Sequence, residues 1–167
     1  MTREAAMVKS GPGVGRRSNR MSVRVLIADS SGEGREVIRH HLDCMGCDVI
    51  AETDNAVQTA NLFRTVHPQV VILDSALKTG GDLDALGLVR MIRHDSPDTA
   101  IIAVIPASDS ERARAFADEG ALECLVQPLV SDGFERVWRK LLTRFPELRP
   151  VELPHAKAAR RNGSHRA

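Results

Sequence analysis

A single aspartate, Asp74, stands directly after four apolar residues, Val70-Val-Ile-Leu73, and before a loop rich in glycine and aspartate. Such an apolar run is typical of a strand that is buried on both faces of a parallel sheet. In open parallel sheets the functional sites lie at the carboxyl ends of the strands. An aspartate in this position therefore indicates a functional site more than a turn. The other predicted strand ends bring Asp29, Ser30, Ile105, Pro106, Gln127 and Pro128 to the same edge.

The chain also contains a Cys-x-x-Cys pattern, Cys44-Met-Gly-Cys47, with His40 one helical turn before it. A redox-active cysteine needs a helix N-terminus, where the helix dipole lowers the pKa of the thiol, whereas Cys44 lies near the end of a predicted helix. His40, Cys44 and Cys47 supply three metal ligands without a fourth, and Cys124 falls on a distant strand. We therefore expect neither redox chemistry nor a metal site here, and three cysteines make no disulfide framework.

Strand-like and helix-like segments alternate from residue 23 to residue 144. The predicted strands are Val23–Ala28, Asp48–Glu52, Gln69–Leu73, Ala100–Ile105 and Glu123–Val126. The predicted helices are Glu33–Met45, Ala56–Val66, Ala85–Arg93, Asp109–Glu119 and Ser131–Thr143. Asn55 and Ser131 are the predicted N-caps of the second and fifth helices. This alternation predicts an α/β fold, a doubly wound parallel sheet with helices on both faces.

The net charge of +1 hides a division into an acidic body and two basic ends. Residues 1–22 carry five Lys or Arg against one Glu, and residues 145–167 carry five against two Glu. We expect these ends to be a flexible leader and a flexible tail around one domain, 23–144. Contact of the basic ends with nucleic acid is the less favoured interpretation. The final residues are too few for a DNA-binding output domain.

Neither a membrane span nor a secretory signal is visible in the sequence. No apolar run approaches the roughly 18 residues that a membrane helix needs, and residues 1–21 lack the apolar stretch of a signal peptide. We therefore expect a cytoplasmic protein that makes no membrane contact.

Four motifs, in order, resemble the receiver domains of bacterial two-component response regulators. Val25-Leu-Ile-Ala-Asp29 resembles their first strand, and Val70-Val-Ile-Leu-Asp74 resembles their third. Glu119-Gly-Ala121 is similar to the turn before their fifth strand, and Leu125-Val-Gln-Pro128 is similar to their Lys-Pro motif. The resemblance covers about residues 22–144 and implies the flavodoxin-like (βα)5 fold with strand order 2-1-3-4-5.

The resemblance also implies a chemistry, phosphoryl transfer from a histidine kinase or a phosphotransfer protein to Asp74. Asp29, Ser30 and Asp74 occupy the positions that hold Mg²⁺ in the family. Ile105 or Pro106 occupies the position of its phosphoryl-binding hydroxyl residue. Gln127 occupies the position of the family's lysine, before an expected cis peptide bond to Pro128. Cys124 occupies the position of the family's aromatic switch residue. The resemblance further implies that a downstream protein docks on the surface formed by the fourth helix, the fifth strand and the fifth helix.

Several of these positions depart from the family pattern. Ser30 replaces a second acid, so we expect Mg²⁺ to bind weakly. Ile105 and Pro106 have no hydroxyl, and Gln127 can donate a hydrogen bond but brings no charge. The chain contains no tyrosine, and with Cys124 in place of the aromatic residue the family's hydroxyl–aromatic relay cannot operate. Lys78 replaces a proline in a loop about three residues longer than usual, where it either supplies positive charge or is solvated.

These features leave several functions open. The leading one is a receiver module that is phosphorylated on Asp74 or acts through protein docking. The alternative is a pseudo-receiver that works independently of phosphorylation, and binding of nucleic acid by the basic ends is less favoured. We do not expect an enzyme, because the sequence shows neither a Ser/His/Asp set nor a glycine-rich phosphate loop. Without the relay, a phosphoryl analogue should change the protein only near Asp74.

Overall fold

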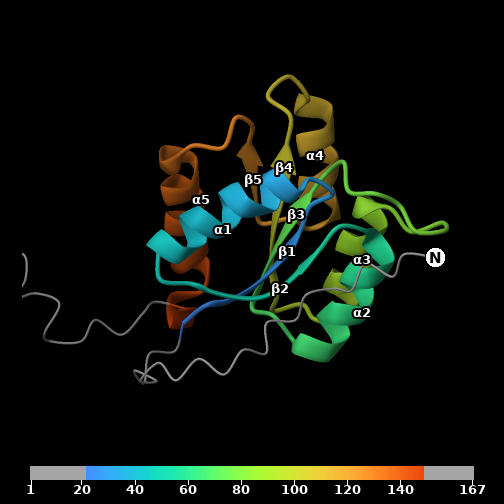
Figure 1. The fold of residues 1–167 in the computed structure, drawn as a ribbon, viewed down its shortest axis with the longest axis horizontal. Coiled ribbons are helices and arrows are strands. Elements are labelled where there is room, and N and C mark those ends of the chain that lie inside the picture. Colours follow the sequence, from blue (N-terminus) through green and yellow to red (C-terminus); the bar gives the residue numbers. More distant parts are fainter. Residues whose placement is uncertain (1–21, 149–167) are drawn as a thin grey trace, which may run out of the picture.

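The computed structural model of the chain describes residues 22–148, which fold around one five-stranded parallel sheet (Figure 1). The strands are β1 (Arg24–Ala28), β2 (Asp48–Thr53), β3 (Val70–Asp74), β4 (Ala100–Ile105) and β5 (Glu123–Val126). Their order across the sheet is β2-β1-β3-β4-β5, and each neighbouring pair runs parallel. The flavodoxin-like order expected from the sequence is therefore confirmed.

Helices cover both faces of the sheet (Figure 1). They are α1 (Gly32–Cys44), α2 (Ala56–Val66), α3 (Ala85–Asp95), α4 (Ser110–Glu119), α5 (Ser131–Arg144) and a short 3-10 helix, Pro146–Leu148. The apolar side chains of α1 and α5, among them Leu42 and Phe134, pack on one face. Those of α2, α3 and α4, among them Phe63 and Phe116, pack on the other. The sheet is thus doubly wound, as predicted.

The central strand β3 is buried on both faces. Successive strand residues point to opposite sides of a sheet, so Val71 and Leu73 join the core under α2 and α3, whereas Val70 and Ile72 join the core under α1 and α5. Burial of each such side chain stabilises the fold by about 1.5–3 kcal/mol. Asp74 is the first polar residue of the strand, and this burial fixes the place where its carboxylate emerges.

The predicted N-caps had different outcomes. Asn55 caps α2 as expected, because its side-chain oxygen accepts the N–H of Gln58 at 2.9 Å. The prediction that Ser131 caps α5 is wrong. The N-cap is Val130, whose carbonyl oxygen accepts the N–H of Phe134 at 3.3 Å. Ser131 is instead the first residue of the helix, one position after the cap.

The packed body continues beyond residue 144, where the sequence placed the end of the domain. Phe145 is half-buried against the core under α1 and α5, and Leu148 is buried within that core. Their burial helps to offset the entropy lost on ordering this segment. Residues 1–21 and 149–167, which make up most of the two predicted flexible ends, lie outside the described residues. Within the described part, no helix is both long and apolar enough to cross a membrane.

The two caps give a matched test of the fold. Asn55→Ala removes a side-chain acceptor from the first turn of α2 and should lower the free energy of unfolding by about 1 kcal/mol. Ser131→Ala removes a hydroxyl that makes no cap and should change it by less than about 0.5 kcal/mol. Urea unfolding of both variants measures the difference. Equal losses would contradict the assignment of the caps.

Candidate functional site

The carboxyl ends of β1 and β3 bring two carboxylates together. Ala28 pairs with Leu73 across the two strands, so the residues that follow, Asp29 and Asp74, emerge side by side. Asp29 is only 3% exposed, and Asp74 is half-buried. Two acids in one partly desolvated site repel each other, which makes this arrangement costly unless a cation or a proton compensates for the charge.

The position of Asp74 changes its acidity. Burial is the main cause that raises the pKa of Asp74, and the negative charge of Asp29 raises it further. The N–H of Ala76, which donates to Asp74 Oδ1 at 3.1 Å, and the positive charge of Arg112 act in the opposite direction. The net effect is a carboxyl group that holds its proton more tightly than an exposed aspartate does.

The first turn of α1 shapes the position of Asp29. The N–H of Ser31 donates to Asp29 Oδ1 at 2.7 Å. Gly34 lies so close to this carboxylate that a Cβ atom would stand 2.4 Å from Asp29 Oδ2. Arg35 donates from Nη1 to the carbonyl oxygen of Asp29 at 2.7 Å. Glycine is therefore required at position 34 for steric reasons, a requirement that the sequence analysis missed because it depends on a contact across the turn.

Ser30, the third residue of the predicted Mg²⁺ site, holds the loop that follows β3. Its Oγ accepts the N–H of Lys78 at 2.7 Å, while the carbonyl oxygen of Lys78 accepts the N–H of Ala56 at 2.9 Å. Leu77 is buried in the core next to this contact. The main chain of Lys78 thus links the ends of β1 and β2, and its side chain is exposed.

Arg112 is a neighbour of the site that the sequence analysis did not identify. It lies in the first turn of α4, where its Nε pairs with Asp109 Oδ2 at 3.1 Å. Its Nη1 lies 3.5 Å from Oγ of Ser75, the residue that follows Asp74. A usable signal was present: α4 follows β4, so its amino end lies at the carboxyl edge of the sheet, and an arginine in that turn lies near the site.

The remaining predicted positions lie on β4, on β5 and in the segments that follow them, and none of them is a cation. Ile105 is 1% exposed, and its carbonyl oxygen accepts the N–H of Gln127 at 2.9 Å. Pro106 is half-buried, while Gln127 and Pro128 are exposed. The peptide bond between Gln127 and Pro128 is cis, as expected. Cys124 is half-buried, with its Sγ 3.9 Å from the carbonyl oxygen of Ala113.

The donor set for a divalent ion is small. Asp29 and Asp74 supply carboxylate oxygens, which suit Mg²⁺, but Ser30 replaces a third carboxylate and its hydroxyl accepts an N–H. Residues 22–148 contain no group of three or more His, Cys, Asp or Glu side chains that could hold a metal. The acid pair therefore fits a weakly held ion better than a tightly bound one.

The cysteine pattern carries no comparable chemistry. Cys44, Cys47 and Cys124 are all free thiols. Burial raises the pKa of Cys47 to about 12, which disfavours the reactive thiolate. Cys44 Sγ lies 3.9 Å from Nε2 of His40, a contact between neighbouring turns of α1.

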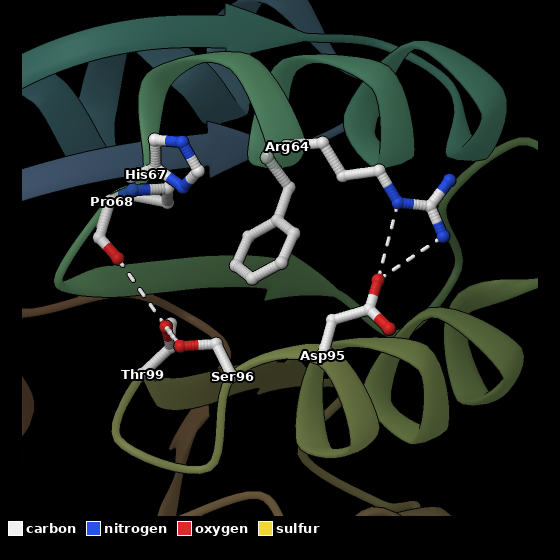
Figure 2. Close-up of a pocket in the computed structure, with 7 residues that line it drawn as sticks. Arg64, His67, Pro68, Asp95, Ser96 and Thr99 are labelled. Atoms are coloured by element: carbon white, nitrogen blue, oxygen red, sulfur yellow. Dashed lines mark hydrogen bonds and ion pairs between the residues drawn. The ribbon is translucent and has the colours of Figure 1, made fainter.

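A hollow of about 360 Å³ lies at the other end of the sheet, before β3 and β4 (Figure 2). The charged groups that line it are already paired, because Arg64 Nη2 lies 3.1 Å from Asp95 Oδ2. Thr99 Oγ1 donates to the carbonyl oxygen of Pro68 at 3.4 Å. Asp74 lies at the opposite strand ends, so this hollow is separate from the acid pair.

Comparison with known proteins agrees with the fold. Residues 25–136 match the family model of the response regulator receiver domain. The chain belongs to this family. It is 31% identical over 125 residues to the response regulator MprA of Mycobacterium tuberculosis, an overlap of 74% of this chain and 52% of the relative. It is 28% identical over 124 residues to a probable C4-dicarboxylate response regulator, DctR, of Priestia megaterium, again over 74% of this chain and 52% of the relative.

The receiver thus spans about half the length of these curated relatives. Among solved structures, a response regulator receiver domain protein from Clostridium thermocellum matches with a TM-score of 0.66 at 21% identity, over 76% of this chain and 99% of that one. The receiver domain of NtrX from Brucella abortus matches with a TM-score of 0.61 at 21% identity, over 74% of this chain and 97% of that one. At these identities the structures support the fold alone.

The raised pKa of Asp74 predicts a pH-dependent cost to stability. A carboxyl group with a higher pKa in the folded chain than in the unfolded chain destabilises the fold when it is ionised. This cost is present above the raised pKa and disappears as the pH falls below the ordinary value near 4. Asp74→Asn should therefore raise Tm at neutral pH by on the order of 2 °C, and the gain should shrink in acid.

Asp82→Asn is the matched control, because Asp82 is exposed in the loop after β3. It removes the same charge from an open position and should leave Tm nearly unchanged. Thermal unfolding of both variants and the parent across the acid range provides the measurement. A lower Tm for Asp74→Asn at neutral pH would show that the ionised carboxylate stabilises the site.

Proposed function

We propose that this receiver accepts a phosphoryl group on Asp74 from a phosphohistidine of a histidine kinase or phosphotransfer protein. The observation that carries the proposal is the pair of carboxylates at the ends of β1 and β3, one buried and one accessible. Asp29 is enclosed, while Asp74 keeps part of its surface open to an incoming group. A second charged carboxylate beside the acceptor has little structural value, which favours a chemical role.

The transfer itself is a displacement at phosphorus. An oxygen of the ionised Asp74 carboxylate forms a bond to phosphorus as the phosphorus–nitrogen bond of the donor breaks, and the departing imidazole nitrogen takes up a proton. Asp29 and Asp74 would hold Mg²⁺, which supplies neutralisation of phosphoryl charge when bound. The N–H of Ala76 already donates to Asp74 Oδ1 and orients the carboxylate.

We place the output of this module in protein docking on the face formed by α4, β5 and α5. Val126 at the end of β5 is 46% exposed, and Val130 before α5 is 54% exposed. These apolar side chains lie beside charged groups, such as the ion pair of Lys140 with Glu123, as in a surface that binds another protein. A cytoplasmic location and a role other than that of an enzyme are part of this proposal.

A second function, the pseudo-receiver, is supported by a specific set of residues. Ile105 and Pro106 bring no hydroxyl to the end of β4, and Gln127 brings no charge after β5. Phosphorylation shifts a two-state equilibrium only through contacts that differ between the two states. If no other residue supplies such contacts, the docking face would remain in one state whatever happens at Asp74.

Labelling of the full chain tests the choice of acceptor. Incubation with acetyl phosphate and Mg²⁺ should add one phosphoryl group, visible by intact mass, and acetate leaves as the phosphorus–oxygen bond breaks. Asp74→Asn should abolish the labelling, because an amide is not a nucleophile here. Asp82→Asn is the control and should be labelled like the parent. Labelling that survives Asp74→Asn would assign the acceptor elsewhere, and a parent chain that is never labelled would favour the pseudo-receiver.

Restoring the missing acid tests the metal site. Ser30→Asp adds a carboxylate beside Asp29 and Asp74 and should tighten Mg²⁺ binding about tenfold, or 1.4 kcal/mol. Aspartate can still accept the N–H of Lys78, so the loop keeps its tether. Ser31→Asp adds the same charge one residue later, where Ser31 already caps α1, and should have a much smaller effect. Titration calorimetry that gives equal affinities for all three chains would contradict the placement of the ion.

A further inference from the structure

We infer that Arg112 is the residue that binds the phosphoryl group on Asp74, in place of the lysine whose position Gln127 occupies. The inference rests on the proposed phosphorylation and adds a contact that the family's motifs do not contain. Arg112 reaches the site from α4, whereas Gln127 follows β5. The cation would thus approach the acceptor from a different element of the fold.

The surroundings of Arg112 already direct its guanidinium toward the acceptor. Nη1 lies 3.5 Å from Oγ of Ser75, the residue next in the chain to Asp74, and Arg112 stands in the first turn of α4 at the same edge of the sheet. The side chain is 39% exposed, so it has room to move a short distance.

Two other cations near this edge are held differently. Arg35 donates from Nη1 to the main-chain carbonyl oxygen of Asp29, so this nitrogen is already engaged. Lys78 contributes its main chain to the loop tether, and its side chain is exposed. Arg112 Nη1, by contrast, lies 3.5 Å from the side chain of Ser75, the residue next to the acceptor, which favours Arg112 over both.

The chemistry of arginine suits this role. A phosphoryl group brings roughly two negative charges at neutral pH. The Asp74 carboxylate loses its own negative charge when its oxygen bonds to phosphorus. The planar guanidinium can donate two parallel hydrogen bonds to phosphoryl oxygens, and these charge-assisted bonds are among the strongest that side chains make. Gln127 can offer only neutral donors from its exposed position.

Asp109 competes with the phosphoryl group for Arg112. Its Oδ2 pairs with Arg112 Nε at 3.1 Å, and its Oδ1 accepts the main-chain N–H of Arg112 at 2.9 Å as the N-cap of α4. Movement of the guanidinium toward Asp74 would break the ion pair but leave the cap in place. Phosphorylation is thereby coupled to the first turn of α4, by a route that needs neither a hydroxyl on β4 nor an aromatic residue on β5.

Four variants of the full chain test this assignment through the affinity for beryllofluoride, a phosphoryl analogue, measured by fluorine NMR with Mg²⁺ present. Arg112→Gln should weaken binding about tenfold, because one charge-assisted pair is lost. Arg112→Lys keeps the charge without the planar fork and should weaken binding less. Arg114→Gln is the matched control, since Arg114 is exposed on the same helix, and should bind like the parent.

Asp109→Asn separates direct binding from a structural role. Asparagine is as good an N-cap as aspartate but does not pair with the guanidinium, so Arg112 is released and the analogue should bind about threefold more tightly. If Arg112 served only to hold α4 through Asp109, Arg112→Gln and Asp109→Asn would weaken binding alike. That result, or an unchanged affinity for Arg112→Gln, would overturn the inference while leaving phosphorylation of Asp74 intact. A parent chain that binds no beryllofluoride would refute the proposed function, and the inference with it.

Discussion

Repulsion between two carboxylates at one strand edge is the constraint on which the rest of the site depends. Asp29 and Asp74 follow adjacent, fully buried strands, so the sheet register holds them together whatever their charge. The fold compensates for Asp29 with the N–H of Ser31, and Gly34 leaves space for this carboxylate. Asp74 accepts the N–H of Ala76, but its burial raises its pKa above the ordinary value. Asp74 is also the acid that is partly open to an incoming phosphoryl group or metal ion.

The loop after β3 shows how one substitution can change the use of a position. A second acid at position 30 would add to the repulsion and would strengthen a metal site. Ser30 instead accepts the N–H of Lys78, and the carbonyl oxygen of Lys78 accepts the N–H of Ala56. The loop is thereby tied to Ser30 after β1 and to Ala56 at the start of α2, with Leu77 buried as its apolar anchor. We expect position 30 to contribute less to the binding of a metal ion and more to the conformation of this loop.

The five strands were predictable from the sequence because each depends on a local apolar pattern, whereas their order, and with it the pairing of Asp29 and Asp74, was implied by the resemblance to receiver domains. The run Val70–Leu73 indicates a central strand by composition alone, and an aspartate after it marks the edge. The roles of Gly34 and Arg112 do not follow from such a local pattern. Gly34 depends on its contact with Asp29 across the turn, and Arg112 depends on the topology that brings the amino end of α4 to the carboxyl edge of the sheet. Ser131 failed for a different reason: a cap depends on where the helix starts to within one residue, and several adjacent residues fit the pattern of a helix start.

The position of Arg112 also changes how the missing family residues should be read. By the resemblance to the family, loss of the hydroxyl at Ile105 and Pro106, of the charge at Gln127 and of the aromatic residue at Cys124 would remove a relay that runs through β4 and β5. It does not remove every contact that can differ between the two states of Asp74. An arginine shared between Asp109 and the acceptor site is such a contact, since each anion can hold it only at the expense of the other. Any response would then begin at the amino end of α4, where the ion pair is broken, and would reach β5 only through the packing of α4 against it. The chain can therefore lack the family's relay residues and still keep a switch. Such a switch requires that the charge on Asp74 decide whether Asp109 or the acceptor site holds the Arg112 guanidinium.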